Sequence, residues 1–280
     1  MKIIDGKALA QNINQRTKDA VHEFISKYGR SPKLSVILVG NNPASEVYVS
    51  SKQKKCTELG IESNLIRCDN HVTESQLLNT IAALNLDQNV DAILLQLPLP
   101  QHLDSYKIIN SIAPAKDVDG LTDANLGKLI SKHYGIVPCT ALGILEMLKN
   151  KKVSGKNTVV VGRSLLVGKP IAQLLTNLNA TVTLCHSKTQ NLEQITKNAD
   201  ILVVAIGQPK YIKAVKRGAI VIDVGINRVD GKLCGDVDFD AVKDIVKEIT
   251  PVPGGVGPMT IAMLMHNTLL CAKHNMKNNK

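Results

Sequence analysis

Short apolar runs that alternate with helical stretches are the feature of this sequence that most restricts its fold. In the first half of the chain, the run Leu34–Val39 ends at a glycine and predicts a buried strand, and Pro43–Leu59 predicts a helix. Ile61–Ile66 is a weaker strand candidate, Thr73-Glu-Ser-Gln76 has the pattern of a capping box that opens a helix, and Ala92–Leu95 predicts another short strand. Strands separated by helices of this length are typical of βαβ units with parallel sheets.

A second series of the same kind occupies the later part of the chain. It predicts strands at Thr158–Val161, Thr181–Cys185, Ile201–Ala205 and Ala219–Val224, and helices at Pro170–Leu178 and Leu192–Lys197. Two such series predict an α/β protein with two α/β lobes and a cleft between them, the second lobe being Rossmann-like. We expect the chain to change lobe near Pro138 and a last helix, residues 259–273, to return to the first lobe. The first lobe would then hold residues 1–137 and 259–280, and the second lobe residues 138–258.

The composition is that of a soluble protein with an aliphatic core. Hydrophobic residues make up 44% of the 280, there is no Trp, and there are only two Phe. Lys and Arg (34) outnumber Asp and Glu (24), and the formal net charge of +10 favours anionic ligands. The sequence has no long basic run and no aromatic-rich strand on which bases could stack, so specific nucleic-acid binding is disfavoured.

Neither a metal site nor a membrane location is favoured by the sequence. The cysteines form no CxxC pair and the histidines no HExxH spacing, which leaves zinc and dithiol redox sites unsupported. The N-terminal residues lack the apolar core of a secretory signal, and no apolar stretch reaches the roughly 18 residues of a membrane span. We therefore expect a cytoplasmic protein with free thiols at Cys56, Cys68, Cys139, Cys185, Cys234 and Cys271.

Tyr48 and Lys52 form the first candidate functional pair. They stand four residues apart within the predicted helix Pro43–Leu59, and this spacing places both side chains on one helix face. A phenol and an amine presented together can bind a flat substrate and move its protons. The same spacing also occurs on ordinary surface helices without a functional site. On spacing alone, an ordinary surface helix is the favoured interpretation.

The second candidate is a glycine turn between a strand and a helix. The strand Thr158–Val161 runs into Gly162-Arg-Ser-Leu-Leu-Val-Gly168-Lys-Pro170, a setting in which backbone and a helix N-terminus can approach a pyrophosphate. The two glycines are six positions apart, so this is not the GxGxxG fingerprint, and nucleotide binding and an ordinary tight turn both remain open. The next strand ends at Cys185-His-Ser-Lys188 without the acidic residue that holds the ribose of NAD. A guanidinium and a hydroxyl at Arg163 and Ser164 suit a 2′-phosphate, which favours NADP.

Several stretches together resemble the bifunctional methylenetetrahydrofolate dehydrogenase/cyclohydrolase family, known as FolD. They span nearly the whole chain in the family's order. They are Pro43-Ala-Ser-Glu-Val-Tyr48-Val-Ser-Ser-Lys52, Gln96-Leu-Pro-Leu-Pro100, Lys116-Asp-Val-Asp119-Gly120, the glycine turn Gly162–Pro170, Cys185-His-Ser-Lys-Thr189, Asp223-Val-Gly-Ile226-Asn227 and Thr250-Pro-Val-Pro-Gly-Gly-Val-Gly-Pro-Met-Thr260. The last of these is the most specific.

The resemblance implies two reactions and their ligands. The first is oxidation of 5,10-methylenetetrahydrofolate to the methenyl form with NADP as cofactor, and the second is hydrolysis of the methenyl form to 10-formyltetrahydrofolate. Tetrahydrofolate derivatives are then the small-molecule partners, and a homodimer is implied. No nucleic acid, membrane or metal is expected to take part.

The resemblance also implies a role for individual residues. The family pattern places the general acid/base at Lys52, the substrate-stacking phenol at Tyr48, the group that orients the lysine at Gln96 and the pterin-binding carboxylate at Asp119. Without it, Gln96 could simply cap a strand and Asp119 could be a solvated loop residue. The expected substrate-binding residues are Tyr48, Gln96, Asp119, Gly254, Gly255 and Pro258. The expected cofactor-binding residues are Gly162, Arg163, Ser164, Gly168, Ser187 and Ile226.

The sequence departs from the family pattern at two places, and three rival interpretations compete with the resemblance. Ala141 stands where the family usually has a proline, and Leu165-Leu166 replaces a pair that is more often polar–apolar, but neither change removes a group assigned to chemistry. A short-chain dehydrogenase also uses Tyr-x3-Lys, but there the glycine turn precedes the pair, which is the reverse of the order found here. The second rival is a single-function folate dehydrogenase, and the third is a basic nucleic-acid-binding protein on a Rossmann-like scaffold.

Overall fold

Contacts divide the chain into two compact units. The computed structural model describes residues 1–133 and 135–278. The first unit combines Met1–Gln11 with Thr140–Met263, and we call it the six-stranded unit after its main sheet. The second combines Asn12–Cys139 with the chain from Leu264 onward, and we call it the three-stranded unit. The α/β architecture expected from the sequence is confirmed, while the assignment of a ligand to each lobe stays a prediction.

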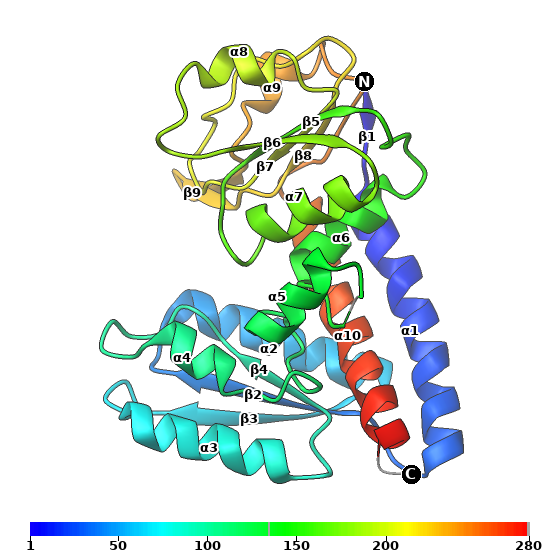
Figure 1. Cartoon of the computed structure of the whole chain (residues 1–280), viewed down its shortest axis with the longest axis vertical. Coiled ribbons are helices and arrows are strands. Elements are labelled where there is room, and N and C mark those ends of the chain that lie inside the picture. The colour runs from blue at the N-terminus through cyan, green and yellow to red at the C-terminus, as the bar shows by residue number, and fades with distance from the viewer. Residues whose placement is uncertain (134, 279–280) are drawn as a thin grey trace. The chain divides into compact units, whose positions relative to one another are not determined.

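The three-stranded unit is built on a parallel sheet in the order β3-β2-β4 (Figure 1). Its strands are β2 (Lys33–Val39), β3 (Glu62–Cys68) and β4 (Ala92–Leu95). Its helices are α2 (Pro43–Leu59), α3 (Glu74–Leu86), α4 (Ser105–Asn110) and α5 (Asp123–Ile130), together with the later parts of α1 (Gly6–Tyr28) and α10 (Val256–Asn278). A buried cluster that includes Ile37 and Ile93 from the sheet, Ile81 from α3 and Ile108 from α4 packs these two helices against the strands.

The bounds of α2 follow from local signals in the sequence. The side chain of Asn42 caps the helix by accepting from the backbone amides of Ala44 and Ser45 at 2.9 and 3.3 Å. Pro43 occupies the first turn, where its missing N–H costs nothing. The helix ends at Gly60, whose φ of 77° is a left-handed conformation that glycine adopts without strain. The predicted range Pro43–Leu59 is confirmed, and it fixes where Tyr48 and Lys52 are presented.

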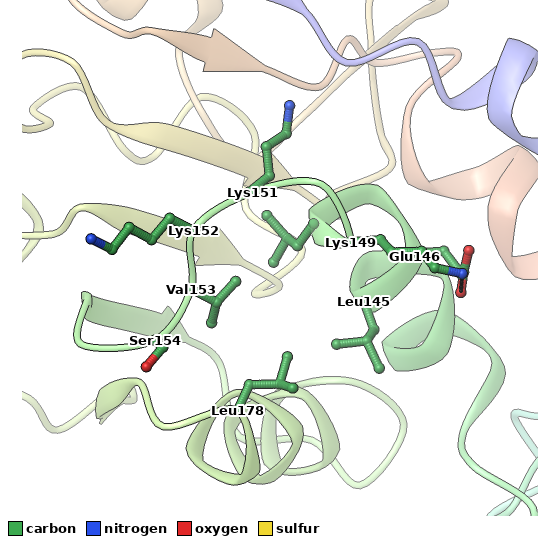
Figure 2. Close-up of a pocket in the computed structure, with 9 residues that line it drawn as sticks. Leu145, Glu146, Lys149, Lys151, Lys152, Val153, Ser154 and Leu178 are labelled. Carbon is green, nitrogen blue, oxygen red and sulfur yellow. Dashed lines mark hydrogen bonds and ion pairs between the residues drawn. The ribbon is translucent and has the colours of Figure 1, made fainter.

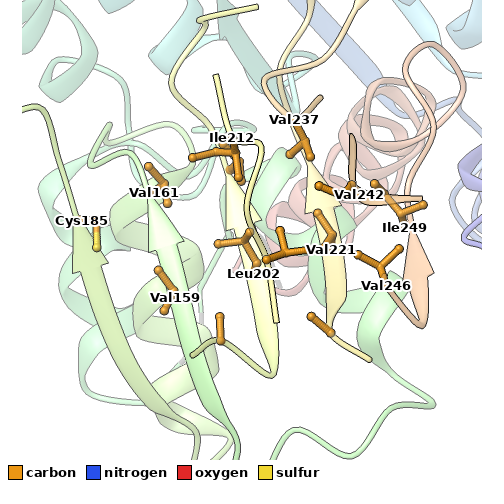
Figure 3. Packing of buried hydrophobic residues seen from close by; sticks show 14 residues of the cluster. Val159, Val161, Cys185, Leu202, Ile212, Val221, Val237, Val242, Val246 and Ile249 are labelled. Atoms are coloured by element: carbon orange, nitrogen blue, oxygen red, sulfur yellow. The ribbon is translucent and has the colours of Figure 1, made fainter. Parts of the chain in front are cut away.

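The six-stranded unit has a wholly parallel sheet in the order β1-β11-β8-β7-β5-β6 (Figure 1). Its strands are β1 (Lys2–Ile3), β5 (Asn157–Val161), β6 (Thr181–Cys185), β7 (Ile201–Val204), β8 (Ile220–Asp223) and β11 (Glu248–Ile249). Its helices are α6 (Cys139–Leu148), α7 (Gly168–Asn177), α8 (Leu192–Thr196) and α9 (Phe239–Val242), and a separate hairpin joins β9 (Asn227–Val229) to β10 (Lys232–Cys234). Figure 3 shows Val159, Leu202 and Val221 from three neighbouring strands in one aliphatic core.

The structure differs from the sequence prediction at several places. Met1–Gln11 belongs to the six-stranded unit, because β1 pairs with β11 and the amide of Ile4 donates to the carbonyl of Ile249 at 2.9 Å. The helix after the glycine turn begins at Gly168 instead of Pro170, and the last helix runs over Val256–Asn278 instead of residues 259–273. Ala141, one of the departures from the family pattern, lies fully buried within α6.

Candidate active site

Lys52 and Gln96 meet at the carboxyl end of β4. The Nζ atom of Lys52, on α2, donates to Oε1 of Gln96 at 2.9 Å, and both side chains are partly buried. The other end of the Gln96 amide is fixed, since Nε2 donates to the carbonyl of Leu97 at 2.6 Å. The amide oxygen therefore faces the amine. Tyr48 lies one turn before Lys52 on the same helix and is exposed, with 42% of its surface accessible.

Asp119 joins this group from the loop between α4 and α5. Burial raises the pKa of its carboxyl, the positive charge of Lys52 opposes that rise, and the neighbouring carboxylate of Asp117 adds to it. The thiol of Cys139 donates to the carbonyl of Val118 at 3.5 Å and lies near Asp119, and burial raises the pKa of this thiol well above its ordinary value, so that it stays protonated. Asp119 is thus not a freely solvated loop residue. It forms a polar group with Lys52 and Cys139.

Two buried networks fix the backbone on either side of Asp119. The Oδ2 atom of Asp117 accepts from the amide and the hydroxyl of Thr122, both at 2.8 Å, and from Nδ2 of Asn125 at 2.9 Å. Asn267, on α10, donates from Nδ2 to the carbonyls of Val118 at 3.0 Å and Val137 at 2.9 Å. Sequence reasoning identified neither Asn267 nor the contact between Cys139 and Asp119. No local spacing signals either one, because each partner lies at least twenty positions away along the chain.

The glycine turn is packed so closely that only glycine fits at its two ends. Gly162 has a φ of 114°, and a Cβ atom placed there would lie 2.1 Å from the carbonyl oxygen of Ala205. A Cβ at Gly168 would lie 1.9 Å from the carbonyl oxygen of Gly162. Ser164 Oγ accepts from the amide of Val167 at 3.2 Å, and Val167 itself caps α7 with no side-chain hydrogen bond. Glycines let a ligand approach the backbone closely, and a helix N-terminus attracts negative charge. Together they form a site that suits a pyrophosphate.

The expected cofactor residues lie at one edge of the six-stranded sheet. Gly162, Arg163 and Ser164 follow β5, Ser187 follows β6, and Ile226 follows β8, so that all come after the carboxyl ends of parallel strands. This is the edge at which open α/β sheets bind ligands. The side chains of Arg163, Ser164, Ser187 and Ile226 are all exposed. The residues present therefore fit a phosphorylated dinucleotide.

The expected substrate residues fall in both units. Tyr48, Lys52, Gln96 and Asp119 belong to the three-stranded unit, whereas Gly254, Gly255 and Pro258 belong to the six-stranded unit. The carbonyl of Gly254 accepts from the amide of Lys7 at 3.2 Å. Gly255 packs against Gly6, where a Cβ would lie 1.9 Å from the Gly255 carbonyl oxygen. The start of α1 therefore holds this loop in place.

A cavity of 480 Å³ in the six-stranded unit lies apart from all of these residues. Figure 2 shows Leu145, Val153 and Leu178 pointing into it, while the side chains of Lys151 and Lys152 point away. Lys151 is instead paired with Glu248. None of the predicted site residues lines this cavity, so it is not the candidate active site. Within residues 1–133 and 135–278, no group of three or more His, Cys, Asp or Glu side chains is placed to hold a metal ion.

The fold and the glycine turn define a dinucleotide-binding α/β protein that also carries a partly buried Lys–Gln–Asp group. Two family profiles match the chain. Residues 4–119 match the tetrahydrofolate dehydrogenase/cyclohydrolase catalytic domain, and residues 138–276 match the NAD(P)-binding domain of the same name. The chain therefore belongs to the tetrahydrofolate dehydrogenase/cyclohydrolase family.

Relatives and solved structures agree with this assignment over the full length. The chain is 52% identical over 284 residues to the bifunctional protein FolD of Campylobacter concisus, with 100% of both sequences covered, and 52% identical over 275 residues to that of Halalkalibacterium halodurans, with 97% of this chain and 98% of the relative covered. Among solved structures, FolD from Campylobacter jejuni superposes with a TM-score of 0.95 at 46% identity, covering 98% of this chain and 99% of that one. The Trypanosoma brucei enzyme, complexed with NADP cofactor and inhibitor, superposes with a TM-score of 0.94 at 38% identity, covering 98% of both chains.

The resemblance seen in the sequence is thereby confirmed. The protein is a bifunctional enzyme with a dehydrogenase and a cyclohydrolase activity, and its cofactor is NADP. No helix in the described part of the chain has the length and apolar character needed to cross a membrane.

Proposed function

We propose that the two activities run in sequence on this chain, with Lys52, Gln96, Tyr48 and Asp119 acting on the folate. 5,10-Methylenetetrahydrofolate is oxidised to the 5,10-methenyl cation, which water then converts to 10-formyltetrahydrofolate. The observation that carries this proposal is the hydrogen bond of 2.9 Å from Lys52 Nζ to Gln96 Oε1, with Asp119 within reach of the same positive charge.

In the oxidative step, the residues of the chain chiefly bind and orient the substrate. NADP⁺ supplies the acceptor for the hydride that leaves the methylene carbon. The exposed ring of Tyr48 offers a face on which the pterin can stack, and the Asp119 carboxylate accepts hydrogen bonds from the donor edge of the pterin. Orientation of this kind is the main requirement for hydride transfer. Gly254, Gly255 and Pro258 are proposed as further substrate contacts.

In the hydrolytic step, Lys52 moves protons. Water attacks the methenyl carbon between its two nitrogens, and both protons must leave this water: one reaches the nitrogen that departs from the carbon, and the other is released. Lys52 Nζ accepts and returns these protons, and Gln96 Oε1 holds Nζ in one direction throughout. One proton is released overall, because a cation and water give a neutral formyl product.

For the cofactor we propose Gly162, Arg163, Ser164, Gly168, Ser187 and Ile226 as the contacts. Support comes from their common position at the carboxyl edge of the sheet and from the close packing at the two glycines. The exposed guanidinium of Arg163 suits the 2′-phosphate that distinguishes NADP from NAD.

We further propose that the enzyme works as a homodimer in the cytoplasm and that its product supplies formyl groups for purine biosynthesis. The family resemblance supports these assignments. No membrane or nucleic-acid partner is proposed.

One spectrophotometric experiment tests the function. Purified protein receives methylenetetrahydrofolate with NADP⁺, and NADPH formation is followed together with the rise and decay of the methenyl chromophore. We expect NADPH to form and the chromophore to decay faster than in the enzyme-free control. NADPH formation with a methenyl product that decays only at the uncatalysed rate would identify a single-function dehydrogenase. Salt-sensitive nucleic-acid binding without NADP⁺ turnover would favour a nucleic-acid-binding protein.

A further inference from the structure

One buried carboxylate accepts hydrogen bonds from three backbone amides of the loop that follows β7. Asp236 is completely buried, and its Oδ2 atom accepts from the amides of Ile206 at 2.7 Å and Gly207 at 3.0 Å. Its Oδ1 atom accepts from the amide of Gln208 at 2.9 Å. Three successive amides beyond the carboxyl end of β7 therefore point at one side chain. A carboxylate can accept all of them at once because it has lone pairs on both oxygens.

The same carboxylate also holds the loop that follows β8. Oδ1 of Asp236 accepts from Nδ2 of Asn227 at 2.9 Å, and Asn227 directly follows the proposed cofactor residue Ile226. A Cβ atom at Gly225, on the other side of Ile226, would lie 2.3 Å from Cγ of Asp236. The backbone on both sides of Ile226 is thus fitted to this one side chain.

Asp236 is itself held in place by a second buried carboxylate. Oδ1 of Asp223, the last residue of β8, accepts from the amides of Gly225 at 3.0 Å and Asp236 at 2.9 Å, and its Oδ2 accepts from the amide of Val237 at 2.9 Å. A Cβ at Gly235 would lie 1.8 Å from Oδ2 of Asp223, so no larger residue fits there. The backbone that carries Asp236 consequently has little freedom to move.

The loop that Asp236 holds also lies next to the glycine turn. Gly162 packs against the carbonyl of Ala205, which immediately precedes the three amides bound by Asp236. The turn after β5, the loop after β7 and the loop after β8 are therefore linked at the carboxyl edge of the sheet.

We infer that Asp236 is a positioning residue for the dinucleotide, which acts by fixing the loops 206–208 and 225–227 in the conformation that receives the cofactor. This inference rests on the proposed function of the sheet edge. Asp236 is fully buried and affects the cofactor only through the conformation of these two loops. It is specific to the oxidative half of the enzyme, because hydrolysis of the methenyl substrate needs no dinucleotide.

The test is Asp236→Asn, which keeps the shape of the side chain but replaces one acceptor oxygen with an NH₂ group that faces backbone donors. We expect the Kd for NADPH, measured by fluorescence titration, and the KM for NADP⁺ to rise about tenfold to a hundredfold. We expect methenyl hydrolysis, assayed without dinucleotide, to stay within about twofold of wild type. Asp240→Asn is the matched control, because it makes the same chemical change at an exposed residue of the same unit.

Asn227→Ala keeps the inference testable if Asp236→Asn does not fold. It removes one donor to Asp236 and leaves the charge in place, and it should raise the KM for NADP⁺ by a smaller factor at an unchanged rate of hydrolysis. An unchanged KM and Kd in the folded variants, or an equal loss of both activities, would overturn the inference. A wild-type protein without NADP⁺ turnover would instead overturn the proposed function, so the two failures are distinguishable.

Discussion

Lys52 has a neutral hydrogen-bond partner, whereas many lysines of this chain pair with acids. Its Nζ donates to the Gln96 amide at 2.9 Å, while Lys197, for example, donates to the Glu193 carboxylate at 2.6 Å. A carboxylate partner would favour the charged form of the amine by direct Coulomb attraction. The Gln96 amide is neutral and orients the amine through one hydrogen bond, and the Asp119 carboxyl is the acidic group on which the Lys52 charge acts.

We predict that Lys52→Met lowers cyclohydrolase activity by at least about a hundredfold, because methionine fills a similar volume but cannot transfer a proton. Dehydrogenase activity should fall less, since hydride transfer depends on substrate position. The two activities are measured separately, as decay of the methenyl chromophore and as NADPH formation. Lys54→Met, at an exposed position of the same helix, is the control. Hydrolysis at the wild-type rate in Lys52→Met would exclude the proposed proton transfer.

We predict that Arg163→Ala shifts cofactor preference. Loss of a charge-assisted contact to the 2′-phosphate should lower kcat/KM for NADP⁺ by about tenfold to a hundredfold and leave kcat/KM for NAD⁺ nearly unchanged. The measured quantity is the ratio of the two kcat/KM values in wild type and variant. Arg217→Ala serves as control, because this exposed arginine precedes the amino end of β8, away from the carboxyl edge. If the ratio is the same in wild type and Arg163→Ala, Arg163 does not read the 2′-phosphate.

At the scale of elements, α2 is specified almost entirely by its own sequence. Asn42 and Pro43 determine where the helix begins, and Gly60 determines where it ends. The capping box at Thr73 and Gln76 likewise determines the start of α3. These signals act between residues at most a few positions apart, and for this reason the predicted starts of α2 and α3 agree with the structure to within a residue.

We predict that Asn42→Ala destabilises the protein by about 1 kcal/mol, because two amides of the first turn of α2 lose their acceptor. Urea unfolding of wild type and variant gives the difference in the free energy of unfolding. Asn41→Ala, at the exposed neighbouring position, should change this free energy by much less. Equal effects of the two substitutions would show that the cap contributes nothing beyond general helix propensity.

Other elements and contacts could not be predicted, because their partners are far away in the sequence. The two-residue strand β1 exists only through its pairing with β11, which is separated from it by most of the chain. Asn267 and Asp236 have ordinary sequence surroundings, yet the side chain of each forms hydrogen bonds with backbone groups of other segments. Local spacing identifies Tyr48, Lys52 and the glycine turn, the family motifs imply the other site residues, and the structure adds the residues that hold their backbone. Local patterns predict strands and caps, and they do not predict such buried polar networks.

At the scale of the whole molecule, carboxyl groups with opposite pKa shifts determine how stability depends on pH. The Arg67 guanidinium lowers the pKa of Glu46, and Lys216 lowers that of Asp200, so these groups stabilise the fold above their ordinary pKa and lose that contribution as the pH falls. Burial raises the pKa of Asp223 to about 6, and the nearby Asp236 carboxylate adds to the rise, while backbone amides oppose it. The contribution of Asp223 to stability therefore depends on pH in the opposite direction.

The Asp223 carboxyl stays protonated in the folded protein up to about pH 6, whereas in the unfolded chain it ionises near its ordinary value of 3.8. Between these two values the folded state binds more protons than the unfolded state, so the contribution of Asp223 to stability is full below pH 3.8 and is lost as the pH rises to about 6. The full effect corresponds to at most about 3 kcal/mol.

We predict that this contribution is visible as a difference between wild type and Asp223→Asn, which has no titrating group at this position. The free energy of unfolding of wild type, taken relative to the variant, should fall as the pH is raised from 4.5 through about 6 and should be constant above pH 7. Urea unfolding at a series of pH values measures it, and carboxyl groups that do not interact with Asp223 cancel in the difference. Asp240→Asn, at an exposed residue of the same unit, should give no such fall across the same range. A difference for Asp223→Asn that is constant with pH would mean that the Asp223 carboxyl of the folded protein is ionised over this whole pH range. Stabilisation of the carboxylate by backbone amides would then exceed the cost of its burial.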